Sequence, residues 1–509
     1  MVQYVGEIKI PESRKDTLIM AYRYANRNQL QLLPSCIEDY ISLDNPVRAY
    51  DAFIEALDLK ELGLNLDPHQ VGNPQYHPKV MLKLLVYGYA YGIRSSRKLE
   101  RETHQNLAFI WLASGLKPDH KTIAEFRRKN RSQLADILKQ CAYLCIELHL
   151  IEGNTLFVDG SKFKANASIK KTWDEKKIQK VLNNIDQRIA TILSQCETVD
   201  EVEEMNGSLV KMDQELKDQD LLKTKVQGIV TKLKAKKQTS LNTTDPDCTR
   251  INSLAGTHAG YSVQSVVDEK HGLILSADVV SENNDLNQFS RQINQANALL
   301  EPKCQVACAD SGYASTAELA KIDQQGIKVV VPSQRQASEK TPSPFAKDQF
   351  TYDSIHDCYI CPEGHPLTFS SLNKKKKNGH KHYLISAKKT CLACPHYGVC
   401  TSSQQGRKVI RLVNEELREK FEAQYLEPES QAIYRKRKAK VELPFGHIKR
   451  NLGVNAFLLR GLPGVKAEAS ILGTCFNLVR MITLLGVTTL VSLLKEIGGK
   501  YPTSLEGIG

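Results

Sequence analysis

The chain has 509 residues, of which 41% are hydrophobic and 25% charged, and its formal net charge is +12. This length allows two to four domains and a large hydrophobic core. The positive excess indicates an acidic partner, although the clustering of the bases is more informative than their sum.

Secretory, membrane and disulfide-rich classes are not expected. The first residues, MVQYVGEIKIPESRK, lack the apolar core and cleavage site of a secretory signal. The apolar run at residues 481–494 is too short to span a bilayer and predicts one packed C-terminal helix. Thirteen cysteines, mostly scattered, favour a reducing cytosol over a disulfide framework. We therefore expect a cytoplasmic protein without a membrane partner.

Helices are expected over about residues 34–151, where apolar residues recur at three- and four-residue steps. A Pro-Asp pair interrupts this pattern, and a further helix is predicted to begin near Thr122. The arrangement suits a helix-turn-helix-like DNA-binding domain over residues 1–150, with DNA contacts from Arg127, Arg128 and Arg131. A helical bundle with a solvated basic face accounts for the pattern equally well.

The periodicity changes at residue 151. Residues 151–167 predict a strand with Asp159 at its end. Residues 168–251 form a charged interruption whose two segments of heptad-like apolar spacing predict a helical hairpin. Such a hairpin is either a coiled coil that binds a partner or an insertion packed on its own domain, and we expect the second.

Strands and helices alternate over residues 252–335. A strand hairpin around Gly272, a helix, a strand ending in Asp310, a helix and a strand follow one another. Together with the strand of Asp159, this is the element order of an RNase H-like core, in which the strands of the two aspartates are neighbours. The predicted fold class is a multi-domain α/β protein, with the last part of the core at residues 405–495.

Residues 336–404 are predicted to form a zinc-ribbon-like insertion. Two C-x2-C pairs 29 residues apart have the spacing of four thiolates that bind Zn²⁺ tetrahedrally, and would use Cys358, Cys361, Cys391 and Cys394. Cys400 and His365 are spare or alternative ligands, and the zinc would be structural. Buried cysteines without a metal are the other interpretation.

The stretch YRKRKAKVELPFGHIKR, residues 434–450, holds seven Lys or Arg side chains and one acid, Glu442. A solvated helix face usually interleaves acids with bases. Glu442 is therefore either a lone surface glutamate or a metal ligand beside a polyanion that the cations bind. Phosphodiester chemistry requires clustered carboxylates that bind Mg²⁺ or Mn²⁺, and Asp159, Asp310 and Glu442 could supply them.

These motifs resemble those of the DDE transposases of bacterial insertion sequences, in the branch with a Tyr-Arg-Glu-Lys signature around its third acid. LFVDGSKFKA, ACADSGYAS and YRKRKAKVELPFGHIKR correspond to the motifs of the first, second and third acid. The similarity covers roughly residues 40–165 and 255–485. It implies that Asp159, Asp310 and Glu442 are the catalytic, metal-binding triad.

The resemblance also implies contacts with DNA. Tyr434 and Arg437 would contact the backbone of the transposon end, and Lys449 would hold a nearby phosphate. The signature places three residues between its arginine and its glutamate, whereas four separate Arg437 from Glu442. Lys438 is therefore an alternative holder of the arginine's role.

We expect a DNA transposase that binds terminal inverted repeats, cuts by metal-assisted attack of water and joins the freed 3′-OH to target DNA. Synapsis of two ends implies a homodimer on DNA. Two other hypotheses stay open. A metal-dependent RNase H-like nuclease would cut without joining, and a domesticated relative would only bind DNA as a regulator.

Overall fold

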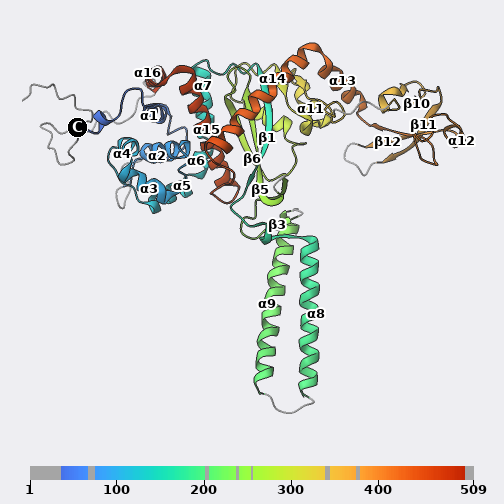
Figure 1. Cartoon of the computed structure of the whole chain (residues 1–509), viewed down its shortest axis with the longest axis horizontal. Coiled ribbons are helices and arrows are strands. Elements are labelled where there is room, and N and C mark those ends of the chain that lie inside the picture. The colour runs from blue at the N-terminus through green and yellow to red at the C-terminus, as the bar shows by residue number, and fades with distance from the viewer. Residues whose placement is uncertain are drawn as a thin grey trace, which may run out of the picture.

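The computed structural model describes seven stretches of the chain, which are residues 36–66, 75–200, 206–236, 240–253, 256–338, 344–373 and 379–498. Its body is a helical layer beside a mixed β-sheet, and a helical hairpin and a second sheet extend from it (Figure 1). The predicted multi-domain α/β class is confirmed.

The central sheet has the strand order β6–β5–β1–β7–β8, and one further strand, β4, pairs with the beginning of β5. The strand β5 is antiparallel to each of its neighbours, whereas β1, β7 and β8 are parallel. The strands are β1 (Thr155–Lys164), β4 (Thr249–Ser253), β5 (Gly256–Asp268), β6 (Ile274–Val280), β7 (Val306–Cys308) and β8 (Lys328–Val330).

Helices cover both faces of this sheet. The consecutive residues Leu156, Phe157 and Val158 are all buried, as expected for a central strand between two layers. Phe157 packs with Val441 of α14, whereas Leu156 and Val158 belong to the main core on the opposite face. The helices that follow or cover the strands are α10 (Phe289–Asn297), α11 (Thr316–Asp323), α13 (Glu415–Leu426) and α14 (Pro428–Gly446).

The N-terminal and C-terminal helices share one hydrophobic core with the sheet, because a single buried cluster runs from Ile41 to Ile497. Residue 150 is therefore not a boundary between separate cores. The helices of this layer are α1 (Val47–Ala56), α2 (Pro78–Ala90), α3 (Ser96–Gln105), α4 (Leu107–Leu112), α5 (His120–Lys129), α6 (Arg131–Ala135), α7 (Ile137–Glu147), α15 (Leu462–Leu485) and α16 (Val487–Gly498).

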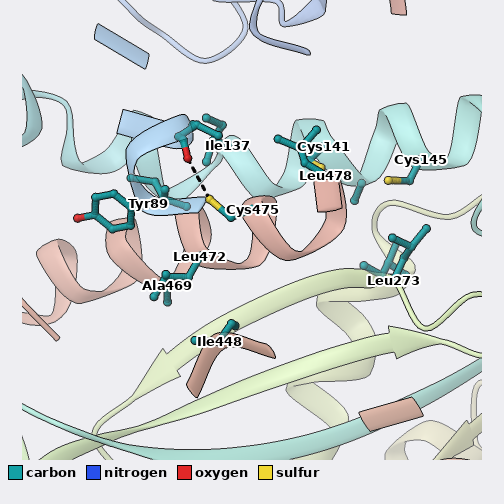
Figure 2. Packing of buried hydrophobic residues seen from close by; sticks show 14 of the residues in the cluster. Tyr89, Ile137, Cys141, Cys145, Leu273, Ile448, Ala469, Leu472, Cys475 and Leu478 are labelled. Atoms are coloured by element: carbon teal, nitrogen blue, oxygen red, sulfur yellow. Dashed lines mark hydrogen bonds between the residues drawn. The ribbon is translucent and has the colours of Figure 1, made fainter. Parts of the chain in front are cut away.

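Helix α15 joins the helical layer to the sheet. It contacts α2, α6, α7 and β6, and its Cys475 thiol donates to the carbonyl of Val86 at 3.3 Å (Figure 2). The buried Asn477 side chain accepts from the backbone N–H of Ile274 and donates to its carbonyl, at 2.9 and 2.8 Å, which satisfies this edge of β6. Unpaired polar groups at a covered sheet edge would be costly.

The apolar composition of α15 follows from this central position. Among the described residues it is the helix long and apolar enough to cross a membrane, and 67% of its most apolar window is buried inside the protein. The packed C-terminal helix expected for residues 481–494 is divided between two packed helices. Gly486, with a φ of 74°, ends α15, and α16 begins directly after it.

The second sheet is antiparallel with the order β13–β12–β11–β10–β9 and has its own core. It lies far from the helical layer, beyond α11 and α13 (Figure 1). Its elements are β9 (Thr351–Asp353), β10 (Cys358–Ile360), β11 (Pro366–Asn373), β12 (His380–Ile385), α12 (Lys388–Leu392) and β13 (Lys408–Leu412).

The charged interruption forms two long helices, α8 (Glu175–Asp200) and α9 (Asn206–Lys236). They project from the body and pack on each other, with a core that includes Ile185 and Val226 (Figure 1). At the base, β2 (Thr172–Asp174) pairs antiparallel with β3 (Ser240–Asn242). The expectation that the insertion packs on its own domain is wrong, because the apolar residues of α8 and α9 are buried against each other.

A hairpin with its own core should be removable. Asp174 and Ser240 are directly paired, so residues 175–239 can be replaced by an Asn-Gly turn, which closes antiparallel strands in two residues. We expect the thermal midpoint of the remaining protein to change by no more than about 2–4 °C, the size of a 1 kcal/mol effect in a large domain. Calorimetry checks this, and loss of the cooperative transition would contradict it.

Candidate active site

The two predicted aspartates lie side by side on neighbouring parallel strands. Asp159 lies within β1, which continues to Lys164 rather than ending at the aspartate as expected. Asp310 follows β7 and accepts the backbone N–H of Gly312 at 2.8 Å. Because Phe157 pairs with Cys308 in the parallel ladder, the residues two positions further along meet at the same edge of the sheet.

A guanidinium from α14 binds both carboxylates. Arg437 donates to Asp159 Oδ1 at 2.9 Å and to Asp310 Oδ2 at 3.2 Å. Its side chain is 11% exposed, and its Nε–H is buried without a hydrogen-bond partner among the described residues. One cation therefore relieves the repulsion between the two acids.

Burial dominates the electrostatics of Asp159. Loss of water around the carboxylate and the nearby charge of Asp310 raise the pKa of Asp159 to about 6, although Arg437 opposes the shift. An ionised Asp159 is thus poorly stabilised by the protein alone. A carboxylate of this kind gains from an additional cation.

Glu442 is exposed on α14 and lies outside this pair. It follows Arg437 by five positions, which is about 140° around a helix of 3.6 residues per turn. Within the described part of the chain, no three His, Cys, Asp or Glu side chains are close enough to hold a metal ion. The structure brings two of the three predicted ligands together, and the role of Glu442 stays a prediction.

A third aspartate that the sequence did not single out lies behind the site. Asp285 accepts from Gln264 Nε2 at 2.6 Å and from Lys162 Nζ at 3.3 Å, and its charge adds to the upward shift in the pKa of Asp159. A Cβ at Gly160 would lie 2.8 Å from Gln264 Nε2, so a side chain there would displace the group that binds Asp285. Because strand residues alternate, Gly160 and Lys162 face away from Asp159, and Asp285 supports β1 from the opposite face. Its only indication in the sequence is the polar run SENND after a strand.

The other bases of the basic stretch take different positions. Lys449, in the π-helical turn His447–Asn451 that follows α14, donates to Ser161 Oγ at 2.6 Å. Burial lowers the pKa of this half-buried lysine, and the charge of Asp159 opposes the shift. Lys438 is exposed.

Tyr434 is a packing residue in this structure. Its ring lies edge-on against Tyr425, with centroids 5.2 Å apart, and it packs beside the cluster of Phe157 and Cys308. Burial raises the pKa of its hydroxyl. The predicted contact with DNA stays a prediction.

The basic helix of the N-terminal region is α5, and its arginines do not form one exposed row. Arg127 is buried and donates to the carbonyl of Arg94 at 2.7 Å and to the Ser96 hydroxyl. Its predicted role in DNA contact is wrong for this arrangement, because Arg127 lies four positions after the buried Ile123 on the same helix face. Arg128 is exposed and pairs with Glu125 at 2.6 Å.

Arg131 begins α6, the next helix, and is half-buried. Its Nε lies 3.9 Å from the position that a Cβ would take at Gly464, close to the start of α15. A DNA contact from Arg131 stays a prediction.

The cysteines of the second sheet do not form the predicted set. Cys358 is buried in β10, where its cross-strand partners are Asp353 and Thr368. A separate cavity is lined by the four other cysteines of this unit, which are Cys361, Cys391, Cys394 and Cys400. The proposed use of Cys358 as a ligand is therefore not supported.

Two protein-family models match parts of the chain. The model described as Transposase DDE domain matches residues 360–482, and the model described as Transposase domain (DUF772) matches residues 35–129. These matches support a transposase. The first includes Glu442 and Lys449 but begins after Asp159 and Asp310, and the second covers α1 to α5.

One solved structure is similar in part, a piggyBac transposase synaptic complex with hairpin DNA determined by cryo-EM. It has 10% sequence identity and a TM-score of 0.33, and the alignment covers 89% of this chain and 79% of that one. A TM-score this low does not establish a shared fold. No curated protein matches the chain.

The raised pKa of Asp159 predicts that the free energy of unfolding depends on pH. Between its ordinary value and about 6, the unfolded chain has released this proton while the folded chain keeps it. Folded stability therefore falls as the pH rises through this window, by a total on the order of 2–3 kcal/mol at about 1.4 kcal/mol per unit.

Asp159→Asn cannot ionise and escapes this cost. We expect the thermal midpoint of the variant minus that of the wild-type protein to be larger at pH 7.5 than at pH 4.5. Melting curves of both proteins at both pH values measure the difference. The same difference at both values would show that Asp159 does not titrate in this window.

Proposed function

We propose that the chain is a DNA transposase that binds terminal inverted repeats, cuts phosphodiester bonds at their ends and joins the freed 3′-OH to target DNA. The observation that carries the proposal is the meeting of Asp159 and Asp310 under Arg437. The sequences around these acids resemble those of bacterial DDE transposases with a Tyr-Arg-Glu-Lys signature. The match to a Transposase DDE domain supports the same activity.

We assign the central sheet to the RNase H-like class. Its support is the strand order β6–β5–β1–β7–β8, with β5 antiparallel and β1, β7 and β8 parallel. In this order the first and fourth core strands are neighbours, and both carry an aspartate at the same edge. A helix, α14, covers the face that carries Asp159.

The donor set fits Mg²⁺ or Mn²⁺, since both prefer carboxylate oxygens and retain several waters. Asp159 and Asp310 would hold the ion, and Glu442 is the proposed third ligand. When bound, the metal supplies activation of the attacking oxygen and stabilisation of charge on the phosphate. The buried, poorly stabilised carboxylate of Asp159 is the observation that favours such a cation.

The protein's own cations would position the DNA. Arg437 lies beside both aspartates, where its guanidinium would bind a phosphate oxygen, because guanidinium groups bind phosphate through paired donors. Lys449 lies beside β1 at the same face, and the exposed Lys438 can neutralise backbone charge without reading the sequence. We place recognition of the repeat in the N-terminal helices, with Arg128 and Arg131 among the bases that would contact DNA.

The proposed partners are transposon ends and target DNA, held by a homodimer in the synaptic complex, in the cytoplasm. A nuclease that cuts without joining would use the same residues. A strand-transfer assay with pre-cut ends distinguishes the two, because only a transposase produces joined product from them.

Removal of a carboxylate should stop chemistry without stopping binding. We expect Asp159→Ala and Asp310→Ala to reduce Mg²⁺-dependent cleavage by at least about a hundredfold, the range for groups that stabilise transition-state charge. Binding of a duplex carrying the inverted repeat should persist, because the phosphate contacts remain. Gel-based cleavage and mobility-shift assays measure both quantities.

Glu442→Gln tests the third ligand. Glu429→Gln is the matched control, since Glu429 is exposed on the same helix and pairs only with Lys328 among the described residues. Cleavage lost in the first variant and kept in the second supports the proposed triad. Full activity of Glu442→Gln would remove Glu442 from it.

Replacing Arg437 should raise the affinity for the metal ion and lower the maximal rate of cleavage. Arg437→Ala removes a positive charge about 3 Å from both carboxylates, so the Mg²⁺ concentration for half-maximal cleavage should fall. The maximal rate should also fall, because a phosphate donor is lost, and Arg437→Lys should restore it in part. Metal titrations of cleavage measure both.

Lys438→Ala is the control for this pair. It should weaken DNA binding slightly without changing the metal requirement, because the side chain is exposed and makes no contact with the aspartates. If Lys438→Ala is instead the more damaging change, Lys438 fills the role of the signature arginine.

A further inference from the structure

The second sheet is too small to be held by its apolar core alone. Its buried hydrophobic cluster contains six residues, which are Phe350, Tyr359, Leu367, Tyr383, Ile385 and Val409. This cluster is separate from the main core of the body. Units of fewer than about 70–80 residues with such cores generally need a metal or a disulfide in addition. A second source of stability is therefore expected.

Four cysteines line one cavity at the edge of this core. Cys361 lies in the turn after β10, Cys391 in α12, and Cys394 and Cys400 in the segment that follows α12. The cavity has a volume of about 30 Å³, roughly two to three times the 10–15 Å³ that one water requires. It is large enough for a single ion but not for an organic cofactor.

The backbone around these sulfurs is arranged as in a thiolate site. The N–H of His365 donates to Cys361 Sγ at 3.3 Å, and the N–H of Arg407 donates to Cys391 Sγ at 3.4 Å. Hydrogen bonds of this kind favour the charged thiolate over the thiol. The first is made within a tight turn, in which the Gly364 N–H also donates to the carbonyl of Cys361 at 2.8 Å.

Cys358 is not part of this cavity. It lies in β10 between β9 and β11, where burial, followed by the charges of Asp353 and Asp357, raises the pKa of its thiol. A neutral thiol among carboxylates is a poor metal ligand. The first C-x2-C pair therefore contributes one ligand rather than two.

We propose that Cys361, Cys391, Cys394 and Cys400 bind one structural Zn²⁺ ion. Zinc prefers four thiolates in a tetrahedron with Zn–S distances of about 2.3 Å. The described side chains do not yet form a closed ligand set, so binding requires rotation about χ1 of the cysteines that line the cavity. The ion would tie β10, α12 and the loop at Cys400 to one another.

Elemental analysis of the purified full-length protein tests this directly. In reducing, chelator-free buffer we expect about one zinc per chain, lost in Cys394→Ser and Cys400→Ser. Cys358→Ser is the matched control, because it changes a cysteine of the same unit outside the cavity, and it should keep its zinc. Retention in Cys400→Ser with loss in Cys358→Ser would overturn the ligand set, and no zinc in the wild-type protein would overturn the site.

A second measurement covers variants that fail to fold. Wild-type protein grown with Co²⁺ in place of Zn²⁺ should show the intense sulfur-to-cobalt charge-transfer bands of a four-thiolate tetrahedral site. Octahedral cobalt spectra, or a pair of disulfides found by mass spectrometry of the reduced preparation, would contradict the proposal. Neither readout involves DNA, so the zinc site and the transposase activity can fail independently.

Discussion

Two carboxylates held next to each other repel, and the candidate site depends on how this repulsion is relieved. The parallel pairing of β1 with β7 brings Asp159 and Asp310 to one edge of the sheet, where burial strengthens every charge interaction. Arg437 balances both from a helix 127 residues beyond Asp310. The same geometry that makes the acids costly to the protein makes them good ligands for a divalent cation.

Helix α14 can supply that guanidinium because one of its sides packs on the sheet while the other carries most of its bases. Val441 is buried against Phe157, Cys308 and Val330, so the helix is fastened across the sheet. The bases on its other side face solvent. Acids are nearly absent from the basic stretch, so its cations find partners on other elements: Arg437 binds both aspartates, and Lys436 pairs with Glu269.

The two units that extend from the body are stabilised locally. The hairpin α8–α9 has a continuous apolar seam and a two-stranded ladder at its base. The second sheet has a small aromatic cluster and a group of four cysteines beside it. Neither unit contributes to the main core, which runs instead through α15 and links the N-terminal helices to the sheet. Insertions with their own stabilising contacts can interrupt a catalytic sheet without disturbing its register.

The sequence by itself determined the order of elements from β1 to β8 and the helical hairpin, because both follow from local periodicity. It also determined that Asp159 and Asp310 would meet, since few strand orders are compatible with that sequence of strands and helices. The tertiary structure alone decided which charged side chains are buried. Arg127 and Arg128 are neighbours in one basic run, yet one is enclosed and the other is exposed. Cys358 and Cys361 are three residues apart and face different surroundings. Residue type specifies which interactions a side chain is able to make, but the surroundings of that side chain depend on elements that are distant in the chain and pack against it.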